Sequence, residues 1–448
     1  MDTIGAWNAL LRSDVELTRA YCEGFAASMR ARKLTFGDRV HCPFLRPFFL
    51  TEMDEARMRT AAETIAALGE RVTAAALESP SLFNQLRLTG AETRLVRMDP
   101  GYACASTASR LDAFLLPAGL HFAEYNAESP AGLGYTQRLC ELFDAMPAMS
   151  RFRAGRSVRF NATIEPMLDA LLASYREWGG RADPPHIAIV DWREVPTWTE
   201  FEILRDAFTA CGVPTSVCDP RDLTFENATL RCGERRIDLV YRRVLINDIL
   251  ARPAECAALL HAYEKKAVCV ANTFRCKLAH KKAFFAVLTD DRNHDLFSAA
   301  EREVIAAHVP WTRVVVDNET VKNGKRGSLL QLAEEQRETL VLKPNDEYGG
   351  TGVMLGWETS SGDWSSALNA ALANPAVTWV VQERIPVRRE VFPMFDRAGE
   401  VTMQDMLVDF APYLFRGRMA GYLTRLSSTG LANVTSGGGQ VPAFVVSE

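Results

Sequence analysis

The sequence predicts an α/β protein built from α+β subdomains, and three patterns lead to this fold class. Strand-like apolar runs alternate with an amphipathic helix between residues 184 and 247, as in a parallel sheet covered by helices. Two short strand-like runs at 111–116 and 120–125 flank a Pro-Ala-Gly turn and predict a hairpin. A strand, a glycine-bearing loop and a second strand follow one another over residues 341–353. At 448 residues the chain is long enough for two or three packed subdomains.

Taken in order along the chain, the elements begin with a helical segment. Residues 1–95 alternate charged and apolar side chains at helical spacing and predict a mainly helical region. The hairpin follows, and then the α/β layer, with a strand at 187–190, a helix at 200–211 and strands at 213–217 and 237–241. The polar, glycine-bearing stretch at 322–327 predicts an exposed turn.

The composition argues against several classes of function. A formal net charge of -5 gives no global basic field, so we expect neither nucleic acid nor a membrane as a partner. No run approaches about 18 uninterrupted apolar residues, and the start, Met1-Asp2-Thr3, lacks the order of a secretion signal. The 10 cysteines form no Cys-x-x-Cys pair and the 7 histidines no His-Glu-x-x-His, so zinc chemistry is not expected. We therefore expect a cytoplasmic protein with reduced thiols.

The predicted hairpin carries four polar residues whose parity can be worked out. Arg110 and Asp112 share one face of the first strand, and Glu124 and Asn126 share one face of the second. Two acids, an amide and an arginine can therefore converge on one surface. Oxygen ligands of this kind suit Mg²⁺, which binds one or two carboxylates plus substrate phosphates. The alternative is the solvated polar face of an antiparallel hairpin.

The strand that ends at Lys343 leads into a loop with Gly349, Gly350 and Gly352. Glycines let the backbone approach phosphate oxygens and present N–H donors, while the lysine adds a compact positive charge. The order of strand, loop and strand differs from the strand, loop and helix of a Walker loop. This pattern predicts an element that covers a triphosphate, and the alternative is a glycine-rich hairpin turn.

Two segments in the C-terminal part add candidate contacts. The strand at 379–383 runs into a connection limited by Pro386, where backbone groups can meet an adenine edge; the alternative is a plain buried strand. Arg425 and the glycines at 437–439 add a cation and a point of close backbone approach.

One pair of arginines is a candidate for the substrate. Arg242 and Arg243 follow a predicted parallel strand, at the edge where α/β sheets place their ligands. Two guanidinium groups there can grip a substrate carboxylate through paired hydrogen bonds. The alternative is a pair of surface arginines.

Together these elements resemble the circularly permuted ATP-grasp proteins, the group that includes the synthetase half of glutathionylspermidine synthetase. The resemblance extends from about residue 100 to the end of the chain. Arg110-Leu111-Asp112 and Glu124-Tyr125-Asn126-Ala127 stand in the pattern of that family's magnesium-binding segments. Lys282-Ala283 and Lys343-Pro344 match the surroundings of its two phosphate-binding lysines, although Lys281 replaces the usual asparagine. Permutation would explain why the metal ligands precede the nucleotide lysines.

The resemblance implies the cofactors ATP and Mg²⁺ and a role for each candidate residue. ATP binding is expected of Lys282, Lys343, Gly349, Gly350, Gly352, Gln382, Glu383 and Ile385. Metal binding is expected of Asp112, Glu124 and Asn126, and catalysis of Arg110 and Arg425. The candidates for substrate binding are Arg242, Arg243 and Asn433. Whether Lys281 or Lys282 faces the phosphates stays open.

The activity that the resemblance implies is an ADP-forming ligase. Such an enzyme joins a small-molecule or peptide carboxylate to an amine acceptor through an acylphosphate. The alternatives are a catalytically inactive nucleotide-binding or regulatory module and a small-molecule kinase. We expect residues 1–150 to hold the helical region and the metal-bearing hairpin, 151–265 a Rossmann-like pre-ATP-grasp layer for the substrate, and 266–448 the ATP-grasp lid and the nucleotide-binding part.

Overall fold

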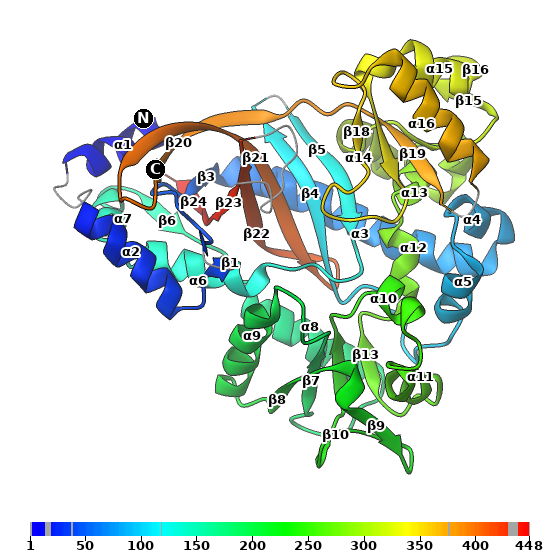
Figure 1. The fold of residues 1–448 in the computed structure, drawn as a ribbon, viewed down its shortest axis with the longest axis horizontal. Helices are drawn as coiled ribbons and strands as arrows, with labels where there is room; N and C mark the ends of the chain where they lie inside the picture. The colour runs from blue at the N-terminus through cyan, green and yellow to red at the C-terminus, as the bar shows by residue number, and fades with distance from the viewer. Residues whose placement is uncertain are drawn as a thin grey trace.

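The computed structural model describes residues 2–13, 19–36, 39–117, 119–374, 377–428 and 438–447, and the side chains of residues 13, 19, 20 and 36 are left undescribed. Figure 1 shows three lobes: a central sheet flanked by N-terminal helices on the left, an α/β lobe at the bottom and a third lobe at the upper right. The chain thus has the mixed α/β character that the sequence predicts. Within the described residues, no helix combines the length and apolarity needed to cross a membrane.

The central sheet is antiparallel and joins strands that lie far apart in the sequence. Its order is β23 (Gly439–Val441), β22 (Arg418–Ser427), β21 (Val401–Phe415), β4 (Ala108–Leu116) and β5 (Gly119–Asn126), with β20 (Arg388–Phe395) also paired to β21. The long helix α3 (Glu52–Glu78) packs on this sheet and lies behind it in Figure 1. Residues near 110 and residues near 425 therefore become neighbours.

β4 and β5 confirm the predicted hairpin and the predicted parity. Arg110 lies opposite Asn126, and Asp112 lies opposite Glu124. The register shifts after Asp112, so that Ala123 forms a bulge between the two regular stretches of the hairpin. The apolar side chains of β5 stay in the core on both sides of this bulge. The four polar side chains consequently share the opposite face.

The N-terminal part is mainly helical, as predicted, but it also contributes short strands. Its elements are α1 (Thr3–Ser13), α2 (Arg19–Ala31), β1 (Thr35–Phe36), β2 (Arg39–Val40), β3 (Phe48–Thr51), α3, α4 (Pro80–Gln85) and α5 (Gly90–Val96). β3 pairs in parallel with β24 (Ala443–Ser447), which also pairs with β6 (Ser157–Arg159). Helices α6 (Leu133–Asp144) and α7 (Pro147–Phe152) complete this side of the molecule.

The lower lobe is the α/β layer that the sequence predicts. Its parallel sheet has the order β13 (Cys269–Ala271), β12 (Leu239–Arg242), β7 (Ile187–Val190) and β8 (Thr215–Cys218). Its helices are α8 (Ile164–Glu177), α9 (Trp198–Ala210), α10 (Ile246–Ala251) and α11 (Ala257–Glu264). The 3-10 turn η2 (Pro220–Asp222) and a small antiparallel sheet of β9 (Leu223–Glu226), β10 (Thr229–Cys232) and β11 (Arg235–Arg236) were not predicted.

The upper lobe has its own antiparallel sheet and its own core around Trp364. The sheet order is β14 (Thr312–Val314), β19 (Trp379–Glu383), β17 (Leu340–Pro344) and β18 (Met354–Leu355). Helices α13 (Ala283–Leu288), α14 (Ala299–His308), α15 (Leu329–Glu335) and α16 (Ser361–Ala373) belong to this part of the chain, with the 3-10 turns η4 (Asp291–Leu296) and η5 (Arg337–Thr339). The turn predicted at 322–327 joins β15 (Glu319–Lys322) to β16 (Lys325–Ser328); residues 323–326 are exposed, whereas Lys322 is buried and Gly327 half-buried.

A short linking segment connects the lower lobe to the upper one. It consists of η3 (Phe274–Cys276) and α12 (Lys277–His280), and it leads directly into Lys281 and Lys282. Helix α12 contacts α3, α5 and β5. The two lysines of interest are therefore held where the central sheet and the two other lobes meet.

Candidate functional site

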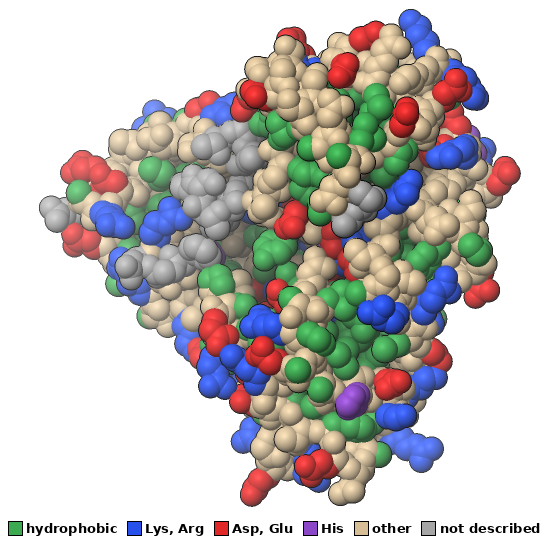
Figure 2. All heavy atoms as spheres, turned by 45° about the vertical axis from the view of Figure 1, so that its right-hand side comes forward, with side chains coloured by type: hydrophobic (Ala, Val, Ile, Leu, Met, Phe, Trp, Pro, Cys, Tyr) green, Lys and Arg blue, Asp and Glu red, His purple; other side chains and the backbone are tan. Residues whose placement is uncertain are grey.

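A pocket lies between the central sheet and the sheet of the upper lobe; its empty space, open solvent at its mouth included, amounts to about 1070 Å³. Its charged lining includes Asp112, Glu124, Lys282, Lys343, Glu347, Glu383, Asp409 and Arg425. Its apolar lining includes Phe114, Val341, Val353, Leu355, Trp357, Ile385 and Val387. Figure 2 shows acidic and basic side chains gathered near the middle of the face where the upper and lower lobes meet. The pocket thus combines an apolar wall with a dense set of charges.

The carboxylate of Asp112 is held by two arginines. Arg110 Nε donates to Asp112 Oδ1 at 2.7 Å, and Arg425 reaches Asp112 Oδ2 at 2.6 Å. Burial by itself would raise the pKa of the Asp112 carboxyl, but the charges of Arg110 and Arg425 outweigh it and hold that pKa below its ordinary value. Arg110 and Asp112 are buried, with exposed fractions of 8% and 6%, so the alternative of a solvated hairpin face is wrong for them.

The other two polar residues of the hairpin lie differently. Glu124 lines the pocket, and Asn126 Nδ2 donates to its Oε1 at 3.1 Å. Asn126 and Arg110 are not among the residues that line the pocket; Arg110 also donates to the carbonyl oxygen of Ala131 at 3.0 Å. The structure therefore places Asp112 and Glu124 at the pocket surface, with Arg110 and Asn126 behind them as their hydrogen-bond donors.

Asp409 is a pocket residue that the sequence analysis did not single out. It lies on β21, is 1% exposed, and forms an ion pair with Arg425, while its Oδ1 has no hydrogen-bond partner among the described residues. Burial raises the pKa of Asp409 to about 7 against the charge of Arg425, and the nearby Asp112 adds to the rise. An acid inside the apolar run 406–411 was the available signal, because acids are almost never buried without a reason.

The structure separates the two adjacent lysines. Lys282 lines the pocket, where its Nζ lies 3.3 Å from Glu124 Oε2 and donates to the carbonyl oxygen of Glu347 at 2.5 Å. Lys281 points into the interior, where its Nζ lies 2.6 Å from Glu92 Oε1. Of the two, Lys282 is therefore the one placed to meet a ligand in the pocket.

Lys343 stands at the end of β17, as predicted, and lines the pocket. Its Nζ donates to Gln382 Oε1 at 2.6 Å, and Gln382 in turn donates to Thr312 Oγ1 at 3.1 Å. Burial lowers the pKa of Lys343 to about 8; the charge of Glu124 opposes this change, and the neighbouring Lys282 adds to it. A second neutral acceptor is the carbonyl oxygen of Ala123 at 3.4 Å. An ammonium group whose hydrogen-bond acceptors are neutral is well suited to receive an anion.

The segment 345–353, here called the glycine loop, joins β17 to the antiparallel β18, so the predicted order of strand, loop and strand is confirmed. Gly349, Gly350 and Gly352 all have positive φ, which L side chains rarely adopt. Gly349 and Gly350 line the pocket, whereas Gly352 does not, and a Cβ atom at Gly352 would come within 2.8 Å of Pro344 Cγ. Gly352 therefore serves the close turn of the loop back onto β17.

The segment after β19 contributes Gln382, Glu383 and Ile385 to the pocket. The backbone N–H of Glu383 donates to Trp311 and that of Arg384 to Thr339, each at 2.8 Å. These two donors are therefore used within the protein. The side chain of Glu383 also pairs with Lys322 at 3.2 Å. A flat ring bound beside this segment would contact the apolar lining of the pocket and those backbone groups of 382–385 that are not already hydrogen-bonded.

The remaining candidates lie elsewhere. Arg242 is fully buried and Arg243 is 5% exposed, so the alternative of two surface arginines is wrong. Arg242 donates to the carbonyl oxygen of Val244 at 2.7 Å, and Arg243 donates to that of Pro130 at 2.5 Å. Neither arginine lines the pocket. Asn433 lies outside the described residues.

The donor chemistry of the pocket fits a hard cation that shares its shell with phosphate. Within the described part of the chain, no three His, Cys, Asp or Glu side chains are grouped so that they could hold a metal ion by themselves. Mg²⁺, however, keeps several waters and takes one or two carboxylates plus substrate phosphates. Asp112 and Glu124 line the pocket together, and the buried Oδ1 of Asp409 accepts no hydrogen bond from the part of the chain that the structure describes.

The fold is similar to that of a glutathione synthetase-like effector from Globodera pallida, solved in its apo form. The TM-score is 0.61 at 13% sequence identity, over 95% of this chain and 96% of that chain. A proposed gamma-glutamylcysteine synthetase from Methylobacillus flagellatus gives a TM-score of 0.42 at 12% identity, over 79% of this chain and 83% of that chain, which is too low to carry an argument. No protein-family model and no curated protein matches the sequence. At this identity the first likeness establishes the fold alone.

Proposed function

We propose that this chain is an ATP-dependent carboxylate–amine ligase of the circularly permuted ATP-grasp type. One observation carries the proposal: a single pocket combines two lysines, a glycine loop, an arginine and a group of carboxylates with an apolar wall from the upper lobe. A triphosphate needs the cations and the metal-binding acids, and a purine base needs the apolar wall. The fold likeness to a glutathione synthetase-like protein supports the same proposal.

In this proposal the nucleotide lies across the pocket from β19 to the hairpin. Val341, Leu355 and Trp357 would cover the base, and the segment from Gln382 to Ile385 would border its edge. Lys343 and Lys282 would bind phosphate oxygens, because their ammonium groups lie beside Gln382 and Glu124 at the charged part of the pocket. The glycine loop would close over the phosphates and exclude water.

Asp112 and Glu124 would hold Mg²⁺, with Asp409 as a further candidate. Bound there, the ion would neutralise charge on the β- and γ-phosphates. Arg110 and Asn126 would orient the two acids, since each donates a hydrogen bond to one of them. Arg425 lines the pocket and would stabilise the charge that develops on the transferred phosphoryl group.

The proposed reaction has two steps. The substrate carboxylate attacks the γ-phosphorus, the bond to the bridging oxygen of ADP breaks, and an acylphosphate forms. The amine then attacks the acyl carbon, loses a proton and expels phosphate, so that the products are an amide, ADP and phosphate. The lower lobe, residues 151–265, would bind the carboxylate at the carboxyl edge of its parallel sheet. The ranges 1–150 and 266–448 share the central sheet and would together bind the nucleotide.

The test is a screen for ADP release with Mg²⁺ and ATP against pooled amino acids, small peptides and polyamines. A ligase gives ADP only when a carboxylate and an amine are both present, and mass spectrometry finds the amide. ADP release with one substrate alone identifies a kinase instead. Tight binding of Mg-ATP without any turnover across the pools would favour an inactive nucleotide-binding module. If calorimetry detected no binding of Mg-ATP, the proposal would be wrong.

A further inference from the structure

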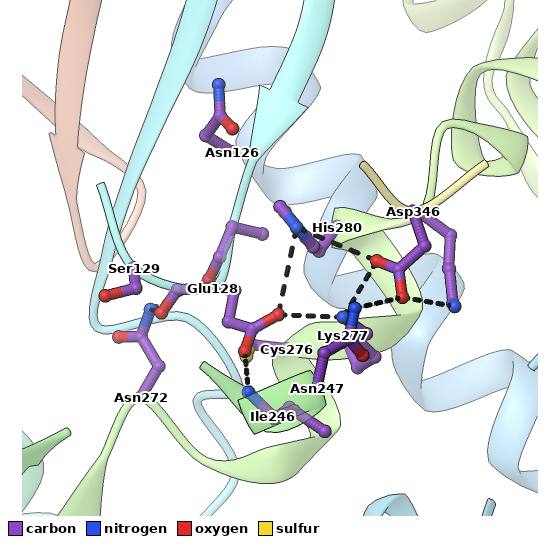
Figure 3. Close-up of polar contacts among 12 residues, drawn as sticks. Asn126, Glu128, Ser129, Ile246, Asn247, Asn272, Cys276, Lys277, His280 and Asp346 are labelled. Carbon is purple, nitrogen blue, oxygen red and sulfur yellow. Dashed lines mark hydrogen bonds and ion pairs between the residues drawn. The ribbon is translucent and has the colours of Figure 1, made fainter. Parts of the chain in front are cut away.

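Beneath the glycine loop lies a buried cluster of charges, which we call the loop-root network. It consists of Glu92, Glu128, Arg242, Lys277, Lys281 and Asp346. Five of the six side chains are exposed by 4% or less, and that of Asp346 by 17%. Three acids and three bases balance one another. Figure 3 shows how the part around Glu128, Lys277 and Asp346 links α12 to the glycine loop.

Asp346 is the acid that both lysines of this network approach closely, whereas Glu92 lies close to Lys281 but 3.9 Å from Lys277 Nζ. Lys277 Nζ lies 2.8 Å from Asp346 Oδ1, and Lys281 Nζ lies 2.7 Å from Asp346 Oδ2. Each lysine also has a second acid: Lys277 pairs with Glu128 at 3.0 Å and Lys281 with Glu92 at 2.6 Å. One carboxylate thus bridges the first residue of α12 and the residue that follows its last.

This bridge anchors the first residues of the glycine loop and leaves the following ones exposed. Asn345 is 1% exposed, its Oδ1 accepts the backbone N–H of Ala283 at 2.8 Å, and its carbonyl oxygen accepts that of Lys282 at 3.0 Å. Asp346 is clamped by the two lysines. From Glu347 to Gly352 the residues are exposed or half-buried, and Tyr348 is 61% exposed. The exposed part of the loop therefore starts at Glu347, whose carbonyl oxygen accepts from Lys282 Nζ at 2.5 Å.

The same bridge decides which lysine enters the pocket. Lys281 and Lys282 are consecutive, and Asp346 together with Glu92 holds the ammonium group of Lys281 in the interior. The side chain of Lys282 then points the other way, toward Glu124 in the pocket. The backbone hydrogen bond from Lys282 to Asn345 ties this choice to the base of the glycine loop.

We propose that Asp346 is a positioning residue for the nucleotide pocket, holding the base of the glycine loop on α12 and directing Lys282 toward the phosphates. The inference rests on the proposed function for its ligand, but the anchoring of the loop can be measured without one. Asp346 need not touch the nucleotide. It acts by fixing Lys281 and the start of the loop, so that only Glu347 to Gly352 have to be ordered when a ligand binds.

The variant that tests this is Asp346→Asn, which keeps the shape of the side chain and removes its charge. The fold should survive, because Lys277 keeps Glu128 and Lys281 keeps Glu92. The matched control is Glu390→Gln, which likewise removes an acid from a buried ion pair, that with Arg46 at 2.6 Å, on the distant strand β20. Both variants should lose stability, so a loss of stability alone does not distinguish them.

Hydrogen exchange of the ligand-free protein gives the first distinguishing measurement. In Asp346→Asn, amides in peptides covering 344–353 and 279–284 should exchange about ten-fold faster than in the wild type, while Glu390→Gln leaves them unchanged. Equal exchange in these peptides for the wild type and Asp346→Asn would overturn the anchoring role, whatever the protein binds.

Calorimetric titration with Mg-ATP gives the second measurement that distinguishes the two variants. Asp346→Asn should bind about 10- to 100-fold more weakly, as when a group that orients a ligand-binding residue is lost, and Glu390→Gln should bind like the wild type. Faster exchange in Asp346→Asn with no Mg-ATP binding by the wild type would support the anchoring and reject the nucleotide as ligand. Wild-type affinity in Asp346→Asn would overturn the positioning role.

A milder variant checks the direction of the effect. Asn247 on α10 is exposed, and its Nδ2 donates to Asp346 Oδ2 at 3.2 Å. Asn247→Ala removes this single hydrogen bond and leaves both ion pairs of Asp346 in place. Mg-ATP affinity should fall by about two- to three-fold, as expected for one exposed neutral hydrogen bond. A loss as large as that of Asp346→Asn would mean that the charge of Asp346 is not what holds the loop.

Discussion

Two clusters of charged side chains lie next to each other in this protein, and they differ in how completely their charges are matched. In the loop-root network, Lys277, Lys281 and Asp346 each face two or more partners of opposite sign. In the pocket, Arg425 is shared between Asp112 and Asp409, and Lys343 has a neutral acceptor in Gln382.

The pKa values record the same difference. In the network, burial by itself would raise the pKa of Glu128, but Lys277, His280, Arg242 and the backbone N–H of Ile246 together outweigh it and lower that pKa to about 2. The pKa of Asp346 is likewise lowered and that of Lys277 raised, each against burial. At two groups of the pocket burial prevails instead: it raises the pKa of Asp409 to about 7 and lowers that of Lys343 to about 8. The network therefore favours its charged forms, and the pocket disfavours two of its own.

The comparison shows what a buried charge can be used for. A balanced network holds elements together, and removing one member leaves an uncompensated charge in the interior. A group whose charge is disfavoured in the free protein gains most from a ligand of opposite sign, so such groups gather at functional sites. By this criterion the pocket is the part of the molecule suited to bind a ligand, and the loop-root network is the part that fixes the elements around the pocket.

The largest effect should come from breaking the network at its centre. Lys277→Ala removes the cation between Glu128 and Asp346 and should lower the free energy of unfolding by about 3–5 kcal/mol, since two acids are left buried. Lys282→Ala, five residues along and in the pocket, should cost only about 1 kcal/mol. Urea denaturation measures both. Equal losses for the two lysines would remove the distinction between the clusters.

The second largest effect should come from Asp112 in the pocket. Asp112→Asn should reduce ADP formation with carboxylate and amine present by about 10²- to 10³-fold, because the charge cluster that would hold Mg²⁺ and orient Arg425 is lost. Its melting temperature should also fall, since Arg110 and Arg425 both lose a charged partner. Turnover at limiting magnesium equal to that of the wild type would take the metal site away from the hairpin.

Asp409 should affect stability in the opposite direction from the network. Its folded-state pKa of about 7 lies above its ordinary value of 3.8, so its contribution to stability is full below about pH 4 and is lost as the pH rises through 7. Asp409→Asn should therefore be about 2 kcal/mol more stable than the wild type at pH 8, with little difference at pH 4.

Urea denaturation at the two pH values measures this effect. Asp405→Asn, an exposed acid on the same strand that pairs with Arg389, serves as the control and should change little at either pH. If the stabilities of Asp409→Asn and the wild type changed in parallel between pH 4 and pH 8, the charged form of Asp409 would not be disfavoured in the folded protein.

The smallest effect concerns Lys343. Its ammonium group loses its proton near pH 8 in the free protein, so Mg-ATP affinity should fall about ten-fold per pH unit above that value. Lys343→Arg keeps its charge over this range, and its affinity should stay level from pH 7.5 to 9. Calorimetry across this range compares the two. A wild-type affinity that does not change with pH would show that Lys343 does not supply a charge to the phosphates.

Much of the fold could be predicted from local patterns. The hairpin, the parallel layer at 187–242 and the strands on both sides of the glycine loop follow from alternating side chains and turn residues, which act over a few neighbours. Parity also predicted that Arg110 and Asp112 share a face of one strand and Glu124 and Asn126 a face of the other, but Asp112 lies opposite Glu124 only because of the bulge at Ala123. The small sheet at 223–236 and the short N-terminal strands were missed, because two- to four-residue strands carry too little periodicity.

For the candidate site, the sequence by itself determined which kinds of group are present: two lysines, a glycine loop, acids on a hairpin and an arginine near the end of the chain. It could not assign Lys281 and Lys282 to opposite sides, place Arg242 and Arg243 in the interior, or find Asp409 and the loop-root network. Those outcomes depend on which distant residue each charge meets when β21, α12 and the glycine loop pack together. The free energy of a charged side chain depends on its burial and on partners far along the chain. Only the tertiary structure therefore decided which charges are paired within the protein and which are left for a ligand.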